Sequence, residues 1–270
     1  GGLLILAAGS IVSSFSIIPM FENRLGGLLI ATVGFLLIGI GVSAAGTSLL
    51  TFLAKNVDEE KRAASAGVLW LMMIAGFAIT AMITGSLLDP FTPARLFIVC
   101  SSVTFFLLSL ALLAVWGLEN SLVRKPAKTS THTKTVSGGF LGAISAIWEE
   151  KETRLFTLFV FASMFAFSMQ DLILEPFAGS VFYLTPGETT KLSGMQHAGV
   201  FVGMIFVSII CSGRFSTMKI GSLNLWITTG CTLSCLALLI IAILASGATS
   251  IHLQSIVIFL GVSNGIFSIA

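Results

Sequence analysis

The stretch RLFTLFVFASMFAFSMQDLILEPFAG, residues 154–179, carries two acidic side chains inside a long apolar segment. Ser168, Asp171 and Glu175 are three and four residues apart, and this spacing places them on one face of an α-helix. If the helix enters the hydrocarbon near Phe156, Asp171 lies about 22 Å along it, inside a core about 30 Å thick. A polar face at this depth requires a protein partner rather than lipid.

The next apolar span repeats this pattern. Its polar or polarisable side chains on one broad helical face are Ser193, Gln196, His197, Met204 and Ser208. Gly199 and Gly203 form a GxxxG step along the edge of this face, which allows a neighbouring backbone to approach closely. Two polar faces joined by one loop predict a shared cavity, in which Asp171 or Glu175 lies near Gln196 or His197.

The acidic pair permits a functional and a structural interpretation. Ionisable residues inside a membrane mark ligand sites or proton relays. The candidates for these roles are Asp171, Glu175, Gln170, Gln196, His197, Lys191 and Ser168. Alternatively, the two carboxylates lie in the outer headgroup zone, pair with Lys191 or loop amides, and hold a re-entrant loop. Pro176 and Gly179 are expected to end the helix close to this point.

The composition places the whole chain in a membrane. Hydrophobic residues make up 56% and charged residues 10% of the sequence, and the mean hydropathy is +1.03. Eight apolar runs are near the ~20 residues that a spanning helix needs. They are residues 1–20, 27–53, 65–88, 95–118, 154–176, 194–212, 222–246 and 252–270. Backbone amides in lipid must bond within their own segment, so we expect an all-α integral membrane protein.

Basic residues predict the orientation of these spans. If the first span runs outward, the inner loops carry eleven basic residues and the outer loops three: Lys55, Lys61, Arg62, Arg124, Lys125, Lys128, Lys134, Lys151, Arg154, Arg214 and Lys219 against Arg24, Arg95 and Lys191. This imbalance predicts that the loops with the larger number are cytoplasmic. The net charge of +2 therefore reflects membrane orientation, and no nucleic-acid partner is expected.

Metal and enzyme sites are not indicated. His132, His197 and His252 are isolated from one another and from the four cysteines, so no metal-ligand pattern exists. Enzymes that transfer prenyl groups to pigments need clustered aspartates that hold Mg²⁺-diphosphate. Asp58, Asp89 and Asp171 are far apart in the sequence, and no nucleophile is paired with a base. We expect the protein not to be an enzyme.

A polar linker divides the chain into two sets of four spans. Residues 119–153 contain Ser, Thr, Pro and several basic side chains, which is typical of a flexible cytoplasmic connection. Within it, GGFLGAISAIWEEKETR, residues 138–154, fits a short helix in the inner interface or a helical extension of the next span. The predicted units are residues 1–118, the linker, and residues 154–270.

Several segments together resemble one known family. DEEKR at 58–62 precedes GVLWLMMIAGFAITAMITGSLLDPFTPARL at 67–96. More specific is QDLILEPFAG at 170–179, followed by TPGETTKLSGMQHAG at 185–199. These segments resemble the PucC/LhaA branch of the major facilitator superfamily, and the likeness extends over nearly all 270 residues.

The resemblance implies a fold of twelve helices in two six-helix halves, with the substrate path between them. The chain would then be a fragment that contains the third to the tenth helix. The family's gating loop would correspond to CSGRFSTMKIGS, residues 211–222. The gating candidates are Arg214, Lys219, Glu60 and Arg62, although the expected acidic partner is absent from that loop.

The resemblance also implies a function. It indicates a factor of photosynthetic inner or thylakoid membranes that assists assembly of light-harvesting complexes and handles or delivers chlorophyll or bacteriochlorophyll. Its partners would be membrane lipid, light-harvesting or other chlorophyll-binding proteins, and the pigment. Phenylalanines crowd the candidate region: Phe156, Phe159, Phe161, Phe165, Phe167, Phe177 and Phe182. His197 and Gln196 would be axial ligands of the pigment's Mg²⁺ or hydrogen-bond partners within the protein, and the phenylalanines would contact pigment, lipid or core.

The alternative function is a proton-coupled secondary transporter of a small or lipophilic solute. Two desolvated carboxylates one helical turn apart repel each other when both are charged, and such a pair can carry a proton. A transporter of polar solutes needs a polar path lined by both halves. Residues 66–88 and 96–118 contain no charged side chain, so the sequence favours a lipophilic ligand or none.

Overall fold

The computed structural model describes residues 1–116, 145, 148–211, 223–247 and 252–269. Its helices are α1 (Gly2–Phe15), α2 (Ile17–Met20), α3 (Arg24–Asn56), α4 (Glu59–Leu88), α5 (Pro93–Val115), α8 (Lys151–Phe182), α9 (Pro186–Cys211), α10 (Leu223–Ser246) and α11 (Leu253–Ile269). No strand occurs in these residues. Seven helical segments are long and apolar enough to cross a bilayer, with α1 and α2 counted as one segment. The chain is a multi-pass, all-helical membrane protein, as the sequence predicts.

The eighth predicted span is shorter than expected. In the described part of the chain, α11 is apolar but has 17 residues. At 1.5 Å per residue it is about 25 Å long, less than the ~30 Å thickness of a hydrocarbon core. The structure therefore supports seven spans by length, and α11 remains a shorter apolar helix beside them.

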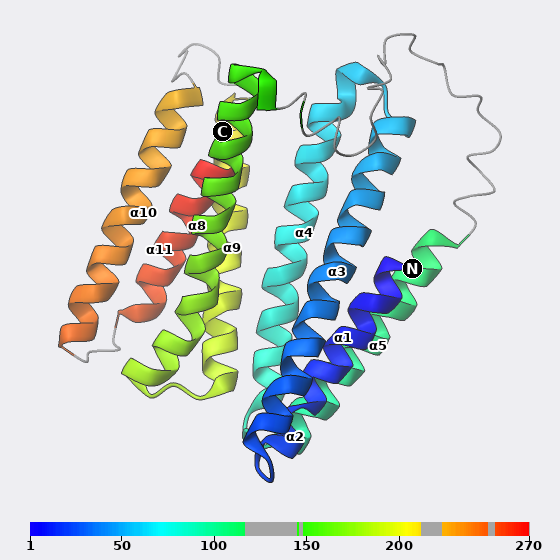
Figure 1. The fold of residues 1–270 in the computed structure, drawn as a ribbon. Helices are drawn as coiled ribbons and strands as arrows, with labels where there is room; N and C mark the ends of the chain where they lie inside the picture. Colours follow the sequence, from blue (N-terminus) through cyan, green and yellow to red (C-terminus); the bar gives the residue numbers. More distant parts are fainter. Residues whose placement is uncertain (117–144, 146–147, 212–222, 248–251, 270) are drawn as a thin grey trace.

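The helices form two groups that meet along α4 and α9 (Figure 1). In the first group, α1 packs mainly against α3 and also against α5. In the second, α11 lies between α9 and α10 and contacts both. The most extensive contacts of α4 are with α9, and the contacts of α8 with α9 are much less extensive. Helix α9 is therefore the element around which the second group and α4 are arranged.

The helix ends alternate between two sides of the molecule. In Figure 1 the end of α3, the start of α4 and the start of α8 lie at the upper side, whereas the α4–α5 and α8–α9 turns lie at the lower side. The α3–α4 connection and the start of α8, which belong to two of the loops predicted to be cytoplasmic, thus lie on one side. That this side faces the cytoplasm stays a prediction from the basic residues.

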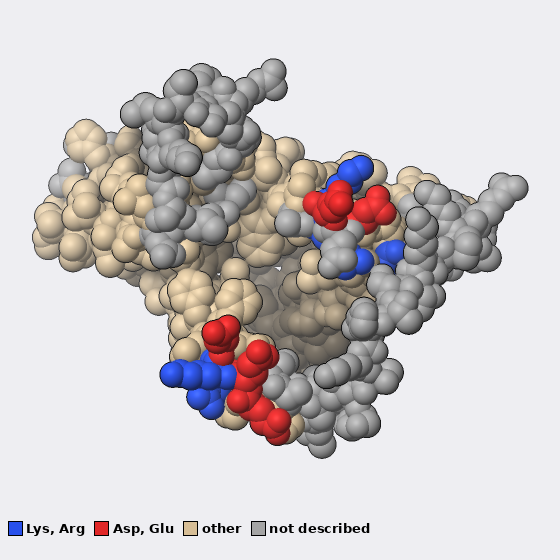
Figure 2. Space-filling view, turned by 90° about the horizontal axis from the view of Figure 1, so that it is seen from above, with Lys and Arg blue, Asp and Glu red and all other residues tan. Residues whose placement is uncertain are grey.

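Figure 2 shows this upper side, where charged atoms gather in two places and the surface between them is hollowed. One set of charged residues belongs to the α3–α4 connection and the other to the start of α8. These residues include Lys55, Asp58, Glu60, Lys61 and Arg62 in the first set, and Glu149, Glu150, Lys151, Glu152 and Arg154 in the second. The two groups of helices are therefore separated at this side, while α4 and α9 remain in contact.

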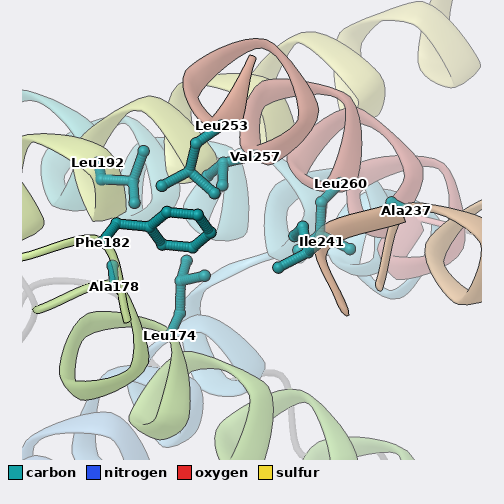
Figure 3. Packing of buried hydrophobic residues seen from close by; sticks show 9 residues of the cluster. All are labelled: Leu174, Ala178, Phe182, Leu192, Ala237, Ile241, Leu253, Val257 and Leu260. Atoms are coloured by element: carbon teal, nitrogen blue, oxygen red, sulfur yellow. The ribbon is translucent and has the colours of Figure 1, made fainter. Parts of the chain in front are cut away.

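The largest described hydrophobic core lies at the opposite end of α8. Figure 3 shows the Phe182 ring between Leu174 and Ala178 of its own helix and Leu253 and Val257 of α11. Leu192, Ala237, Ile241 and Leu260 complete this cluster. A smaller cluster joins Ile74 of α4 to Val200 and Met204 of α9. The lower end of α8 is therefore fixed by packing, whereas its upper turns have little protein around them.

Glycines set the closest helix contacts. A Cβ atom at Gly199 would lie 2.5 Å from the Ile258 carbonyl oxygen of α11, and one at Gly203 would collide with the Val262 carbonyl. The predicted GxxxG contact is therefore confirmed, with α11 as the neighbour.

Helix α8 is longer at both ends than predicted. It begins at Lys151, inside the predicted linker, of which residues 119–144 and 146–147 lie outside the described part. The prediction that Pro176 and Gly179 end the helix is wrong, because α8 continues through both to Phe182. Proline removes a single N–H donor, and membrane helices tolerate this loss. The helix ends instead where Tyr183 adopts a left-handed conformation with φ of 56°.

The next helix starts earlier than the predicted position 194. Pro186 is its first residue, a position that suits proline because the first N–H of a helix has no partner within it. Glu188 accepts a hydrogen bond from the Thr185 amide at 2.9 Å, and the Thr185 hydroxyl accepts one from the Glu188 amide at 3.3 Å. This reciprocal capping fixes the first turn of α9.

Candidate functional site

A polar cluster links α8 to α9 within their membrane-spanning parts. Gln196 Nε2 donates a hydrogen bond to Asp171 Oδ1 at 3.1 Å, and His197 Nε2 lies 3.5 Å from Asp171 Oδ2. The side chain of His197 is 9% exposed and that of Asp171 is 30% exposed. The two predicted polar faces therefore meet, and Asp171 joins them through both carboxylate oxygens.

His197 is held from three directions. Its Nδ1 atom lies 2.9 Å from the carbonyl oxygen of Ser193, one turn earlier on α9. Its Nε2 atom faces Asp171, and its ring packs edge-on against Phe77 of α4, with 5.5 Å between the ring centroids. The polar cluster thus lies where α4, α8 and α9 come together.

Glu175 lies one turn below Asp171 on the same helix and is half-buried. Its carboxylate lies near the Ser193 side chain. Ser193 is thus beside the cluster, with its carbonyl oxygen toward His197. The sequence spacing therefore predicted correctly that Asp171 and Glu175 lie on the face of α8 toward α9.

Two side-chain amide atoms in the cluster region lack hydrogen-bond partners within the described part of the chain. They are Gln196 Oε1 and Gln170 Nε2, and both atoms are buried. Gln196 as a residue is 1% exposed. Ser168, by contrast, is exposed on α8 and is not brought to the cluster.

Lys191 belongs to a different contact. Its Nζ atom lies 3.2 Å from Asp89 Oδ2 at the end of α4, and the Thr185 hydroxyl donates to Asp89 Oδ1 at 3.0 Å. Gly187 packs directly against the Asp89 carboxylate. The structural interpretation in which Lys191 pairs with Asp171 or Glu175 is therefore wrong. Lys191 instead forms an ion pair with Asp89 at the lower side of the molecule.

The gating candidates are described only in part. Glu60 is exposed, and Arg62 Nε donates to the Val57 carbonyl at 3.2 Å, so Arg62 caps the end of α3. Arg214 and Lys219 lie outside the described residues. The structure thus gives Arg62 a local partner and places no described acidic side chain of another helix against it.

Sequence reasoning missed two residues of the site region. Asp89 pairs with a lysine 102 positions away, and Phe77 packs on a histidine from another helix. Neither contact has a periodic signal, since each joins α4 to α9 across the linker. The reciprocal cap of α9 did have a signal, the sequence Thr-Pro-Gly-Glu at 185–188.

The cluster can accept and donate hydrogen bonds, but it offers no open metal site. Both ring nitrogens of His197 face groups of the protein, Nδ1 the Ser193 carbonyl oxygen and Nε2 the Asp171 carboxylate. Gln196 Oε1 is a free acceptor, yet the residue is too deeply buried for a pigment ring to reach it. Within the described residues, no group of three or more His, Cys, Asp or Glu side chains could hold a metal ion.

Comparison with known proteins identifies relatives of this chain. Residues 1–270 match the family described as PUCC protein. The chain is 44% identical over its whole length to the "Bacteriochlorophyll synthase 44.5 kDa chain" of Rhodobacter capsulatus, of which it covers 60%. It is 30% identical to "Protein PucC" of the same organism over 76% of this chain and 42% of that protein.

A third relative, named "Uncharacterized protein in puhA-bchM intergenic region" of Rhodobacter capsulatus, is 32% identical over 65% of this chain and 36% of its own length. The chain therefore spans between about a third and three fifths of the relatives that it matches. The match over all 270 residues and the 44% identity agree with the family that the motifs at 170–179 and 185–199 indicated. The chain belongs to the PUCC protein family.

Proposed function

We propose that the chain is part of a membrane factor that assembles light-harvesting pigment–protein complexes and handles or delivers chlorophyll or bacteriochlorophyll in a photosynthetic membrane. The observation that carries this proposal is the family match over residues 1–270. The name of one relative refers to bacteriochlorophyll, which supports a pigment-related role. Light-harvesting or other chlorophyll-binding proteins would be the partners.

The geometry of α8 supports an apolar cargo or partner. Its upper turns expose Phe156, Phe159, Phe161 and Phe165, and the last two rings are stacked with 6.1 Å between their centroids. Phe182, on the other hand, is buried in the core, and Phe177 packs against that core. The four exposed rings are therefore the ones that we assign to contact with pigment, partner helix or lipid.

The polar cluster has a positioning role in this proposal. Asp171 fixes α8 to α9 through Gln196 and His197, immediately beside the exposed aromatic turns. A Mg²⁺-containing pigment would not be ligated by His197 or Gln196 in this arrangement, because neither offers an accessible free atom. The cluster would instead set the angle at which α8 presents its apolar surface.

We propose that the chain has the major facilitator fold, and the arrangement of its helices supports this proposal. Two groups of helices, drawn from residues 1–118 and 154–270, meet along α4 and α9 and are separated at the upper side (Figures 1 and 2). Such an arrangement is expected of two helical halves around a central path. Residues 119–153 would be the cytoplasmic connection between these halves.

We also propose that the chain does not itself catalyse a synthase reaction. Asp58 lies just before α4 and Asp89 just after it, and this 30-residue helix is about 45 Å long. Asp171 lies in the middle of another helix. Three aspartates so far apart cannot jointly hold Mg²⁺-diphosphate, which requires oxygen ligands around one ion.

One observation favours the second candidate, a proton-coupled secondary transporter of a small or lipophilic solute. Asp171, Glu175 and His197 form a titratable cluster inside the membrane, and such clusters occur in proton relays. The two proposals differ in what the carboxylates must do. An assembly factor needs their shape, whereas a proton carrier needs their titration.

The experiment compares two double variants in a photosynthetic host that lacks the native gene. Asp171→Asn with Glu175→Gln keeps amide oxygens and N–H groups for Gln196, His197 and Ser193 but cannot titrate. Asp171→Ala with Glu175→Ala removes these partners. Near-infrared absorbance of isolated membranes measures the light-harvesting complex. Thr157→Ala serves as control, because Thr157 is exposed on α8 and bonds to its own helix.

We expect the amide variant to retain most of the complex, while the alanine variant loses most of it. Charge-assisted hydrogen bonds lost in the amide variant amount to about 1–3 kcal/mol, which a folded bundle tolerates. Equal and complete loss in both variants, with normal protein levels, would favour proton-coupled transport. Full retention in both would remove the cluster from the assembly role.

A further inference from the structure

The hydrogen bond between His197 and Ser193 determines where the imidazole carries its hydrogen. The partner of Nδ1 is a backbone carbonyl oxygen at 2.9 Å, and a carbonyl can only accept. Nδ1 must therefore donate, so the ring carries a hydrogen on this atom in every charge state that keeps the bond. A neutral imidazole then has a lone pair on Nε2.

This lone pair would face Asp171. Nε2 lies 3.5 Å from Asp171 Oδ2, while Oδ1 already accepts from Gln196. A neutral ring beside an ionised carboxylate would set two lone pairs against each other, with no hydrogen between them. From this geometry we propose that Asp171 and His197 together hold a single proton, which is carried either on Nε2 or on Oδ2.

The Asp171–His197 pair has no net charge whether the proton is on Nε2 or on Oδ2. With the hydrogen on Nε2, the pair is an imidazolium and a carboxylate; with the hydrogen on Oδ2, it is a neutral imidazole and a carboxylic acid. Transfer moves one proton between the two atoms and leaves the net charge of the pair at zero. Loss of the proton would leave a net negative charge inside the membrane, where an uncompensated charge is costly.

Few titratable groups of the described part of the chain lie around the Asp171–His197 pair. From α8, Asp171 and Glu175 are the titratable groups that act on His197. From α4, its ring contacts Phe77, and that helix has no charged residue between positions 66 and 88. The other helix packed on α9 is α11, whose sequence contains no titratable side chain. Glu175 is therefore the one additional described group that can exchange charge with the pair.

This inference is independent of pigment handling. It assigns the buried histidine a fixed role, to neutralise Asp171, and it explains why that carboxylate can bridge α8 and α9 within a membrane span. It also predicts that the imidazole is not free to ligate a metal or a pigment, because one nitrogen donates to Ser193 and the other shares the proton.

Nitrogen-15 NMR of histidine-labelled protein in lipid nanodiscs tests this site directly. The variant His132→Asn with His252→Asn leaves His197 as the single labelled ring. His252 is exposed before α11, and its carbonyl bond to the Ile256 amide does not involve the side chain. Infrared spectra of the same sample report whether Asp171 is a carboxylic acid, through a carbonyl band that Asp171→Asn removes.

We expect either a doubly protonated ring with ionised Asp171, or an Nδ1–H neutral ring with protonated Asp171. Each result places one proton in the pair. An Nε2–H neutral ring, or a neutral ring together with an ionised Asp171, would overturn the proposal. These spectra need no substitution at the site, so they decide the question even if site variants fail to fold.

Two variants sharpen the assignment. Asp171→Asn supplies an amide hydrogen to Nε2, so the ring should become neutral and keep its hydrogen on Nδ1. Ser168→Ala is the matched control: Ser168 lies one turn before Asp171 on α8 and is exposed, so the proton of the pair should stay in place. A ring that stays doubly protonated in Asp171→Asn, or that loses its proton in Ser168→Ala, would contradict a site formed by Asp171 and His197.

Discussion

Helices α8 and α9 carry similar polar faces but lie in different environments. In the most apolar 18-residue window of α8, 6% of the residues are buried, compared with 44% for α9. The two helices follow one another in the chain, and both contribute side chains to the polar cluster. The comparison shows that a polar face predicts which residues meet across two helices, but not how much protein surrounds each helix.

Small residues explain the difference. On α9, Gly194 faces Met82 of α4, and Gly199 and Gly203 face the backbone of α11, so two neighbours approach closely on different sides. The corresponding turns of α8 are occupied by large aromatic side chains that point away from protein. Close approach of backbones gives α9 its central place, because van der Waals contact drives helix association in membranes.

The first prediction compares a glycine of each helix. Gly199→Ala would place its Cβ 2.5 Å from the Ile258 carbonyl oxygen, and overpacking of this kind costs about 3 kcal/mol. Gly179→Ala on α8 meets nothing closer than the Leu184 carbonyl oxygen at 3.7 Å. There the substitution should be neutral or stabilising by about 0.5–1 kcal/mol, since alanine favours helix. Unfolding in mixed detergent micelles, followed by circular dichroism, measures both. Similar losses in the two variants would show that burial of α9 does not depend on its glycines.

Much of this contrast could be read from the sequence. The spacing of Asp171 and Glu175, and of Gln196 and His197, predicted that the two polar faces meet, and the structure confirms that contact. Apolar runs predicted the spans, because hydrocarbon forces each backbone to bond within its own helix. Periodicity therefore predicts well what depends on one helix or on neighbours in sequence.

The rest depends on contacts between distant segments. Asp89 and Lys191 are 102 residues apart, and nothing in either local sequence specifies the other. Small residues gave an ambiguous signal as well: Gly41 packs against Leu6 of α1, whereas a Cβ added at Gly39 or Gly46 on the same helix would meet no described atom within 4 Å. The prediction that Pro176 ends α8 was wrong for another reason, since a proline breaks helices more readily in water than in a membrane.

The second prediction concerns the side of α8 that faces α9. Asp171→Leu removes the acceptor of Gln196 and the partner of His197, and leaves both polar groups unpaired, at a cost of about 2 kcal/mol. Ser168→Leu, one turn earlier where the same face of α8 is exposed, should change the free energy of unfolding by less than about 0.5 kcal/mol. The same detergent unfolding assay compares them. If Ser168→Leu were the more harmful change, the polar contact of α8 with α9 would not lie at Asp171.

The smallest expected effect belongs to the ion pair at the lower side, which joins the same α9 to α4. The Lys191 and Asp89 side chains are 35% and 32% exposed, so solvent screens their attraction more than that of the buried cluster. A double-mutant cycle with Asp89→Asn and Lys191→Met should therefore give a coupling energy of about 0.5–1 kcal/mol. Asparagine keeps an oxygen that can accept from the Thr185 hydroxyl, so the cycle isolates the charge.

Raising the salt concentration should lower this coupling, whereas the effect of Asp171→Leu should change little. A coupling well above 2 kcal/mol, insensitive to salt, would mean that the pair is shielded from water and that α4 and α9 are held together as firmly at this end as at the polar cluster.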